Sequence, residues 1–289
     1  MEIGERMVIP ASWQALDIPT WRDPVLVIGA SDSGKSTLAR YLYRRFCAKH
    51  TRVGFLDGDV GQSTFGLPAT LTLALRRGAD DIGFPPSGKA RSWFVGSNTP
   101  RDGGAWLLVG LHHLWLYALR ASTDALVIDT SGYVDAGGVA LKWAKAALFR
   151  PCTVVALQRA DELTALLTPL RRWPGVRLIE LPVCEAVQSR SREQRRAYRA
   201  ACYRDYFANA SRIPLSRQSL AVFPDGDFTP GRLAALESAE GFVLALALVD
   251  QVSDTSIWLR TPWSGKGRVG ALRMGALRVD ETTFEDTPL

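Results

Sequence analysis

The sequence predicts an α/β fold in which a doubly wound, mostly parallel sheet is flanked by helices. Three observations lead to this fold class. Short apolar runs alternate with helical patterns along most of the chain, which is typical of a parallel sheet with helices on both faces. Residues 29–37 read GASDSGKST and fill the phosphate-loop (P-loop) pattern G-x-x-x-x-G-K-[ST]. The 289 residues are 47% apolar, which is ample for a large core.

The individual elements follow from the spacing of apolar residues. Apolar, β-branched runs predict strands at residues 24–29, 52–57, 92–96, 125–129, 153–157 and 176–181. Apolar residues at helical spacing predict helices at residues 36–46, 105–121, 138–149 and 161–173. The Pro/Gly-rich connection over residues 79–90 is a candidate active-site loop.

The pattern changes after about Ile213, where short alternating segments are punctuated by Gly, Pro and Asp. We therefore expect three parts. They are an N-terminal segment at residues 1–23, a P-loop core at residues 24–212 that includes a lid at about 188–208, and a small, mostly β C-terminal subdomain at residues 213–289.

The composition argues against several classes of protein. No run approaches the roughly 18–20 apolar residues of a membrane span, and the first residues lack the basic-then-apolar layout of a signal peptide. The four cysteines are scattered without metal or disulfide spacing. We therefore expect a reduced, cytoplasmic protein with no membrane partner. The net charge of +6 would favour polyanions such as nucleic acid, but a coding or thermal bias toward arginine explains this total equally well.

The P-loop predicts a nucleoside triphosphate site. Gly29 and Gly34 permit a turn that would strain other residues, and the loop amides can then surround a β-phosphate at a helix N-terminus. Lys35 can reach the β- and γ-phosphates, and Ser36 can ligate Mg²⁺. The residues expected to bind the nucleotide are Gly29, Ser31, Asp32, Ser33, Gly34, Lys35, Ser36 and Thr37.

Carboxylates follow the second predicted strand, in the sequence DGDVGQ at residues 57–62. Ligands of doubly wound folds bind at the carboxyl ends of the strands, so these acids are expected near the γ-phosphate. Transfer to a hydroxyl needs a base, and we assign this role to Asp59. Asp57 is the alternative base, or a ligand of Mg²⁺ through water. Gln62 is a candidate donor to a phosphate or a base, while a plain turn at Asp57 and Gly58 is the competing interpretation.

A further acid, Asp129, ends the apolar strand ALVID. An acid at this place is the expected partner of a P-loop and would hold Mg²⁺ together with Ser36. Tyr133 lies just past the same strand end. Its ring could stack on a base or serve only in packing.

Residues 189–208 predict an arginine-rich helix. Four of its six arginines form one stripe by their i, i+3 and i+4 spacing, namely Arg192, Arg195, Arg196 and Arg199. Within the segment only Glu193 and Asp205 balance them. A solvated surface helix is one interpretation. We favour a lid that places cations over a transferring phosphoryl group and excludes water.

Together these motifs resemble those of the polynucleotide 5′-hydroxyl kinases related to the mRNA cleavage-complex and ribosomal-RNA-processing kinases. The resemblance covers roughly residues 8–212. It rests on GASDSGKST (29–37), DVGQ (59–62), FVGSNTP (94–100), DTSGYV (129–134) and the lid RSREQRRAYR (190–199).

The resemblance implies ATP and Mg²⁺ as cofactors, and a 5′-hydroxyl end of RNA or DNA as the acceptor. It implies Asp59 as the base that activates this hydroxyl. Asn98 and Thr99 would clasp the acceptor backbone, and Tyr133 would stack on a base at a position that often carries Trp in eukaryotic relatives.

The lid arginines of the family are matched by Arg190, Arg195 and Arg199, whose spacing fits. By this resemblance Arg195 and Arg199 act in catalysis, and Arg190 and Arg195 contact the nucleotide. Arg192 and Arg196 are adjacent candidates, which we assign to the nucleic acid.

The leading hypothesis is therefore ATP-dependent phosphorylation of a 5′-hydroxyl end. The sequence starts almost directly at the core, without the long N-terminal β domain of larger members, which suggests a minimal, free-standing kinase. A catalytically silent ATP-binding scaffold is the alternative, although Lys35, Asp59 and the lid arginines argue against it. A P-loop GTPase is a third hypothesis, but no N-K-x-D-type sequence follows a strand.

Overall fold

The computed structural model describes residues 9–79, 81 and 83–289, and these divide into two compact units. Unit 1 comprises the residues up to Gly58 with Leu73–Ala90 and Trp115–Ser189. Unit 2 comprises Asp59–Thr72, Arg91–Leu114 and Arg190–Leu289. Among the described residues, no helix is both long and apolar enough to cross a membrane.

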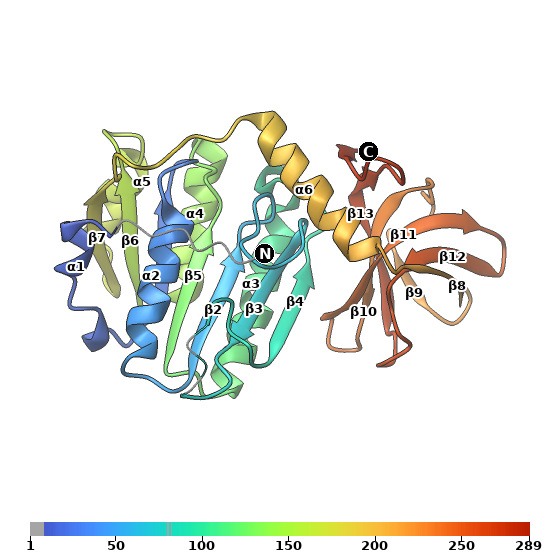
Figure 1. The fold of residues 1–289 in the computed structure, drawn as a ribbon, viewed down its shortest axis with the longest axis horizontal. Coiled ribbons are helices and arrows are strands. Elements are labelled where there is room, and N and C mark those ends of the chain that lie inside the picture. The colour runs from blue at the N-terminus through green and yellow to red at the C-terminus, as the bar shows by residue number, and fades with distance from the viewer. Residues whose placement is uncertain (1–8, 80, 82) are drawn as a thin grey trace. The chain divides into compact units, whose positions relative to one another are not determined.

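The first sheet has the strand order β4-β3-β2-β5-β1-β6-β7 (Figure 1). Its strands are β1 (Val25–Gly29), β2 (Val53–Gly58), β3 (Thr70–Leu75), β4 (Ala90–Phe94), β5 (Ala125–Thr130), β6 (Cys152–Gln158) and β7 (Val176–Pro182). The helices between them are α1 (Ala11–Gln14), a 3₁₀ turn (Ile18–Thr20), α2 (Lys35–Cys47), α3 (Pro100–Arg120), α4 (Ala136–Phe149) and α5 (Thr164–Leu170).

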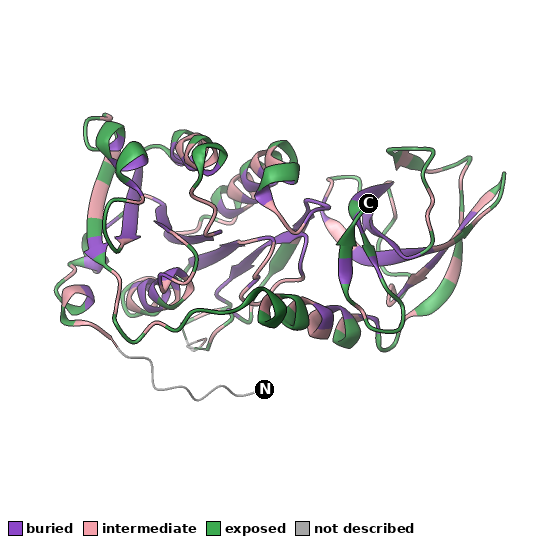
Figure 2. Ribbon diagram, turned by 90° about the horizontal axis from the view of Figure 1, so that it is seen from above, coloured by how far each residue is buried: buried purple, intermediate pink, exposed green. Residues whose placement is uncertain are grey.

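The strands β2, β5, β1, β6 and β7 pair in parallel. Every residue of β1, β2 and β5 is buried, as expected for strands covered on both faces. Helix α2 packs on one face of these strands and α4 on the other (Figures 1 and 2). The predicted doubly wound α/β architecture is confirmed, and the carboxyl ends of these strands meet at one edge of the sheet.

Strand β3, whose residues TLTLAL are all buried, is not among the strands predicted from the sequence. The candidate active-site loop predicted at residues 79–90 is wrong for the described part of that segment. Arg76, between β3 and this segment, donates its amide to the carbonyl oxygen of Val53 and its guanidinium to those of Cys47 and His50. The connection after β3 therefore begins beside the amino end of β2, opposite the edge where ligands of parallel sheets bind.

The second sheet has the order β14-β13-β10-β11-β12-β8, with β9 added beside β13. Its strands are β8 (Ser211–Ser216), β9 (Ala221–Phe223), β10 (Arg232–Glu237), β11 (Val243–Val252), β12 (Ser256–Thr261), β13 (Ala271–Val279) and β14 (Asp286–Pro288). The pairing is antiparallel except between β9 and β13. This sheet confirms the predicted, mostly β C-terminal part.

Side chains of β10 alternate between two hydrophobic clusters. Leu233 and Ala235 belong to one cluster, and Ala234 and Leu236 belong to the other, because successive residues of a strand point to opposite faces. Both faces of the strand are therefore covered by apolar side chains.

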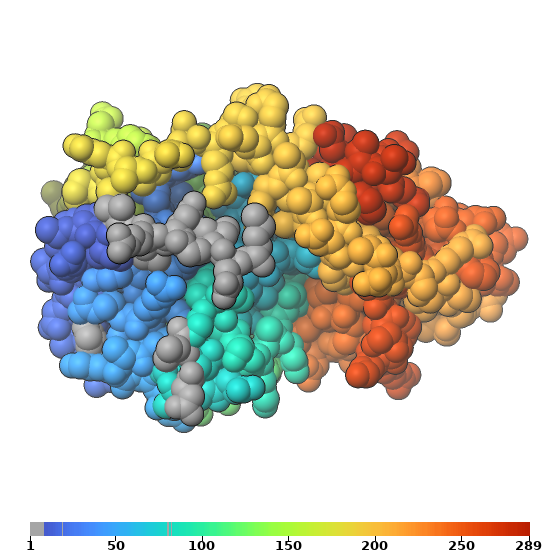
Figure 3. Space-filling view, viewed as in Figure 1, coloured from blue at the N-terminus to red at the C-terminus, as the bar shows by residue number. Residues whose placement is uncertain are grey.

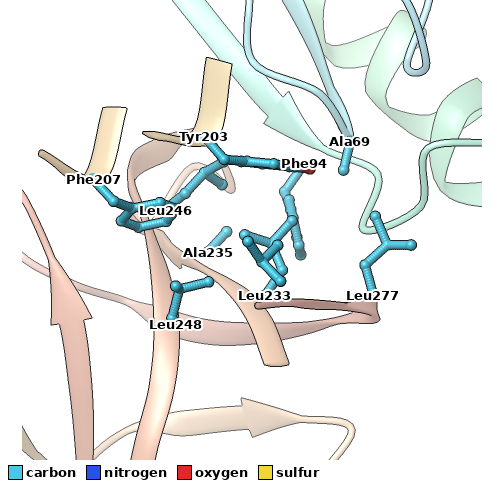
Figure 4. Close-up of a cluster of buried hydrophobic side chains, with 10 residues drawn as sticks. Ala69, Phe94, Tyr203, Phe207, Leu233, Ala235, Leu246, Leu248 and Leu277 are labelled. Carbon is cyan, nitrogen blue, oxygen red and sulfur yellow. The ribbon is translucent and has the colours of Figure 1, made fainter. Parts of the chain in front are cut away.

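Helix α6 (Arg192–Phe207) covers the first of these clusters (Figure 4). Its residues Tyr203 and Phe207 are fully buried and pack there with Leu233 and Leu246. The contacts thus group α6 with the second sheet, in unit 2, whereas the sequence analysis placed it in the core ending at residue 212. The apolar end of the helix is the physical reason for this difference.

Candidate active site

The P-loop of unit 1 joins the buried strand β1 to helix α2. Gly34 precedes the helix with a φ of 84°, in the left-handed region that glycine tolerates. A Cβ atom on Gly29 would lie 2.7 Å from the carbonyl oxygen of Leu157. The turn therefore needs both glycines, and it leaves the first amides of α2 available to an anion.

Two polar side chains of the loop are buried. The Nζ of Lys35 donates to the carbonyl oxygen of Ala30 at 2.6 Å, so the ammonium group lies over the loop itself. The hydroxyl of Ser33 is buried and has no hydrogen-bond partner. A buried hydroxyl without a partner costs free energy, and a phosphate oxygen held in the loop would supply one.

The acids Asp57 and Asp129 are buried at the carboxyl ends of β2 and β5. They are direct register partners on neighbouring strands, so their side chains point to the same face of the sheet. The Oδ1 of Asp129 accepts from the amide of Thr130 at 2.9 Å. Across the described ranges, no group of three or more His, Cys, Asp or Glu residues could hold a metal ion. A cation here would need further ligands, such as Ser36, phosphate or water.

The turn after β5 presses against the P-loop. A Cβ atom on Gly132 would lie 2.6 Å from the backbone nitrogen of Ser31. The next residue, Tyr133, is half-buried, and its hydroxyl would lie 2.5 Å from a Cβ atom on Gly137. The ring of Tyr133 thus packs over the first turn of α4.

A buried lysine that the sequence analysis did not single out holds this turn. The Nζ of Lys142 on α4 donates to the carbonyl oxygen of Ser131 at 2.7 Å. The hydroxyl of Thr130 in turn donates to the carbonyl oxygen of Val27 at 2.8 Å. These bonds fix the end of β5 to β1, just before the P-loop begins.

In unit 2, Asp59 opens a tight turn. Its Oδ1 accepts from the amides of Gly61 and Gln62, both at 3.0 Å, which is an Asx-type turn. A Cβ atom on Gly61 would lie 2.7 Å from the carbonyl oxygen of Asn98. The DVGQ turn and the GSNTP segment are therefore in direct contact.

Helix α6 is tied to the same turn by two hydrogen bonds. The Nε2 of Gln62 donates to the carbonyl oxygen of Arg195 at 3.3 Å. The hydroxyl of Tyr198 donates to the carbonyl oxygen of Ser63 at 2.7 Å. Gln62, predicted to bind nucleic acid, here joins the turn of Asp59 to the arginine-rich helix.

Two further predicted residues share one buried carboxylate. The Nε of Arg199 donates to both oxygens of Asp286 at 2.8 and 3.0 Å, and the side-chain amide of Asn98 donates to the same group. The carboxylate of Asp286 is fully buried, and 15% of the Arg199 side chain is exposed. In this structure both predicted residues hold the strand β14.

The other arginines of the segment lie closer to solvent, and α6 forms part of the surface seen in Figure 3. Arg190, Arg192 and Arg196 are exposed, and Arg195 is half-buried. Arg196 pairs loosely with Glu285 at 3.8 Å. The capping box of Ser191 and Gln194 fixes where the helix begins.

Each unit therefore brings together one set of the predicted residues. Unit 1 contains residues 29–37 with Asp57, Asp129 and Tyr133. Unit 2 contains the residues joined by the contacts described above, namely Asp59, Gln62, Asn98, Arg195 and Arg199. It also contains Thr99, whose Oγ1 accepts from the amide of Arg101 at 3.3 Å.

Three residues of these surroundings escaped the sequence analysis, namely Lys142, Asp286 and Arg159. Arg159 directly follows β6 and donates to the carbonyl oxygen of Asp32 in the P-loop. The signal that could have indicated Arg159 is the polar pair Gln158 and Arg159 at the end of the apolar strand β6. Nothing in the local sequence marks Lys142 or Asp286, because their partners lie 11 and more residues away.

A glycine-capped loop between a buried parallel strand and a helix, with acids at the neighbouring strand ends, defines a P-loop protein. The family described as mRNA cleavage and polyadenylation factor CLP1 P-loop matches residues 29–209, which is more than half of the chain. The chain belongs to this family.

Similar proteins agree with this assignment. A polyribonucleotide 5′-hydroxyl-kinase of Thermococcus kodakarensis is 33% identical over 198 residues, covering 68% of this chain and 55% of the relative. That of Methanocaldococcus jannaschii is 31% identical over 194 residues, covering 64% and 50%. The chain thus spans about half the length of these curated relatives.

A solved structure of the wild-type Clp1p–Pcf11p complex contains a chain with the same fold. Its TM-score is 0.64 at 15% identity, and the match covers 89% of this chain and 74% of that one. At this identity the likeness concerns the fold alone.

Proposed function

We propose that this chain is an ATP-dependent polynucleotide kinase that transfers the γ-phosphate of ATP to the 5′-hydroxyl end of RNA, DNA or both. Its membership of the CLP1 P-loop family carries this proposal. The names of its relatives, polyribonucleotide 5′-hydroxyl-kinases, support RNA as an acceptor. The loop at Gly29–Thr37 and the turn of Asp59 supply the residue types that phosphoryl transfer requires.

The residues of unit 1 would hold the donor. Backbone amides at the start of α2 would bind the β-phosphate, and Ser33 would give its buried hydroxyl to a phosphate oxygen. Lys35 would exchange the carbonyl of Ala30 for the β- and γ-phosphates, as P-loop lysines do.

The buried carboxylates Asp57 and Asp129 fit a divalent cation held together with Ser36. Carboxylate oxygens are ligands that Mg²⁺ prefers, and the two acids are register partners at the carboxyl ends of β2 and β5. Bound Mg²⁺ would neutralise charge on the phosphates. This chain's own part is to keep the two acids in register and to present Ser36 on the first turn of α2.

In the acceptor half, we assign Asp59 as the base. The 5′-hydroxyl oxygen would form a bond to the γ-phosphorus, the bond from that phosphorus to the β–γ bridging oxygen would break, and the hydroxyl proton would pass to Asp59. The amides of Gly61 and Gln62 hold the Asp59 carboxylate in one orientation. Such a base contributes about 10²–10⁴-fold in rate.

We assign the contact with the transferring phosphate to Arg195, with Arg190 as a nucleotide contact. Arg192 and Arg196 are exposed and suited to phosphates of the acceptor, with Thr99 and Tyr133 as further candidates. Arg199 and Asn98 donate to Asp286, so we assign them to positioning this region through that carboxylate.

A transfer assay tests the proposal. Incubation with γ-labelled ATP and matched RNA and DNA oligonucleotides that carry a 5′-hydroxyl should label their 5′ ends. Asp59→Asn should reduce the transfer rate by at least 10²-fold and leave ATP affinity within about twofold, because the amide keeps the shape of the turn.

Asp254→Asn, in the exposed turn between β11 and β12, is the matched control and should transfer at the wild-type rate. Tight binding of ATP without label on any RNA or DNA oligomer would refute the kinase assignment and favour a nucleotide-binding scaffold.

A further inference from the structure

Strand β13 of unit 2 carries a buried arginine that has no part in the proposed reaction so far. Only 7% of the Arg273 side chain is exposed, and its Nε donates at 2.6 Å to Oε1 of Glu237, on the neighbouring strand β10. The Glu237 side chain is 9% exposed. The attraction within such a pair offsets the cost of its desolvation only in part. Stability is therefore a weak reason for placing an ion pair here, and the second bond of the arginine indicates a further role.

The other end of the guanidinium holds the segment that begins at Phe94. The Nη2 of Arg273 donates to the carbonyl oxygen of Phe94, the last residue of β4 and the first of the sequence FVGSNTP. The guanidinium also lies over the rings of Trp106 and Trp93, with its carbon 4.5 and 5.4 Å from their centroids. Cation–π contacts of this kind favour one placement of the group. Arg273 thus joins Glu237 of the second sheet to the start of this segment.

Beyond Phe94, two further residues of the segment are attached to C-terminal strands. The carbonyl oxygen of Gly96 accepts from the amide of Ala276 on β13 at 2.7 Å. The side-chain amide of Asn98 donates to the carboxylate of Asp286 on β14. Every second residue from 94 to 98 is therefore held by β13 or β14.

Thr99 directly follows the last of these attachments, and its amide donates to the Oγ of Ser97 at 3.1 Å. The carbonyl oxygen of Asn98 also touches the turn of Asp59, because a Cβ atom on Gly61 would lie 2.7 Å from it. The second sheet therefore sets the position of Thr99, which is the predicted clasp on the acceptor. It also sets the position of the backbone against which the turn of Asp59 packs.

We propose that the C-terminal sheet positions the acceptor clasp, and that Arg273 is the positioning residue at the start of the clasp segment. The inference rests on the proposed use of a 5′-hydroxyl polynucleotide as acceptor. Arginine suits this role because its planar fork donates in two directions at once, here to Glu237 and to Phe94. A lysine in its place would keep the charge that Glu237 pairs with, but its ammonium group does not reproduce the fork.

Equilibrium binding of RNA in the absence of ATP tests the proposal independently of transfer. The probe is a short RNA oligonucleotide with a 5′-hydroxyl and a 3′ fluorescein label, followed by anisotropy. In Arg273→Lys the affinity for this RNA should fall about tenfold, as expected for the loss of one hydrogen bond from a charged group. Affinity for ATP, measured by calorimetry, should stay unchanged, because residues 29–37 belong to unit 1. Arg278→Lys, exposed on the same strand, is the matched control and should bind RNA as the wild type does.

Two further variants separate positioning from stability. Glu237→Gln removes the charge of the pair but keeps an oxygen for Nε and leaves the bond to Phe94. It should lower the unfolding temperature, since Arg273 stays buried without a carboxylate, and leave the affinity for RNA unchanged. The double variant Arg273→Met with Glu237→Met removes both charges, a replacement that buried ion pairs often tolerate. It should keep the fold and lose RNA affinity to the same extent as Arg273→Lys.

Thr99→Ala shows whether the effect lies at the clasp. In the wild-type background this substitution should weaken RNA binding. In the Arg273→Lys background it should weaken binding by a smaller factor, because substitutions that act on one contact are not additive.

The outcomes separate this inference from the proposed function. Wild-type affinity for RNA in Arg273→Lys or in the double variant would overturn the role of Arg273, and so would an equal loss in Glu237→Gln. Full additivity with Thr99→Ala, or no effect of Thr99→Ala, would overturn the clasp as the place where Arg273 acts. A protein that binds RNA as expected but labels no 5′ end would keep this inference while refuting the kinase. A protein that labels 5′ ends while Arg273→Lys binds RNA normally would keep the kinase and refute this inference.

Discussion

At the scale of single residues, Asp286 changes how the arginines of α6 are understood. By its spacing Arg199 matches the family's lid, yet its guanidinium donates to the carboxylate of Asp286, which also accepts from Asn98. Arg199 and Asp286 lie 87 residues apart in the chain. Local spacing predicts that Arg199 shares a stripe with Arg195 and Arg196, and only the folded chain shows that it holds Asp286.

We predict that Asp286→Ala destabilises the protein strongly. It would leave Arg199 mostly buried without its carboxylate, and breaking a buried ion pair on one side costs about 3 kcal/mol or more. The midpoint of urea unfolding, followed by tryptophan fluorescence, measures this loss. Glu285→Ala removes an exposed partner of Arg196 and should cost less than about 1 kcal/mol. Equal losses in the two variants would contradict the anchoring role of Asp286.

At the scale of the element, α6 combines an apolar end and a charged beginning. Its Tyr203 and Phe207 are buried in the cluster with the second sheet, while its first turn depends on the cap at Ser191 and on bonds to the turn of Asp59. The stable end is thus the carboxyl end. Opening is expected to begin at residues 192–195.

We predict that Ser191→Ala frays this first turn. The loss of an N-cap side chain costs about 1 kcal/mol, so amide hydrogen exchange at residues 193–196 should accelerate about fivefold. Exchange at residues 203–207 should stay unchanged, because that end is held by packing. Ser191→Asp keeps a capping oxygen and serves as the control. Uniform acceleration along α6 would show that the helix opens as one unit instead.

At the scale of the whole molecule, the parallel strands were the most predictable part. Strands such as β1, β5 and β6 are buried on both faces and therefore read as continuous apolar runs. The rule that ligands bind at carboxyl ends then indicated Asp57 and Asp129 before their register was known. Strand β3 was not predicted, and the loop after it was expected at the wrong edge of the sheet. The direction in which a strand runs depends on its pairing with other strands and cannot be read from its own residues.

Acid stability is a property of the whole molecule as well, because many carboxylates contribute to it. Hydrogen bonds from Arg52 lower the pKa of Asp124, and those from the amides of Thr283 and Thr282 lower that of Asp280. Glu237 opposes this trend, since burial raises its pKa. Further carboxylates with a lowered pKa are Asp81, Glu162, Glu193 and Asp227.

We predict that the thermal unfolding temperature is nearly constant from pH 8 to about pH 5 and falls steeply below about pH 4. A carboxyl group whose folded pKa lies below its unfolded value, about 3.9 for Asp and 4.3 for Glu, stabilises the fold above that value. This contribution is lost as the pH falls through the folded pKa. Circular dichroism melts at constant ionic strength measure the profile. Asp280→Asn should lower the unfolding temperature at pH 7 and reduce its drop between pH 7 and pH 3, because an amide does not titrate. A fall centred between pH 6 and 7 would instead assign the transition to a histidine.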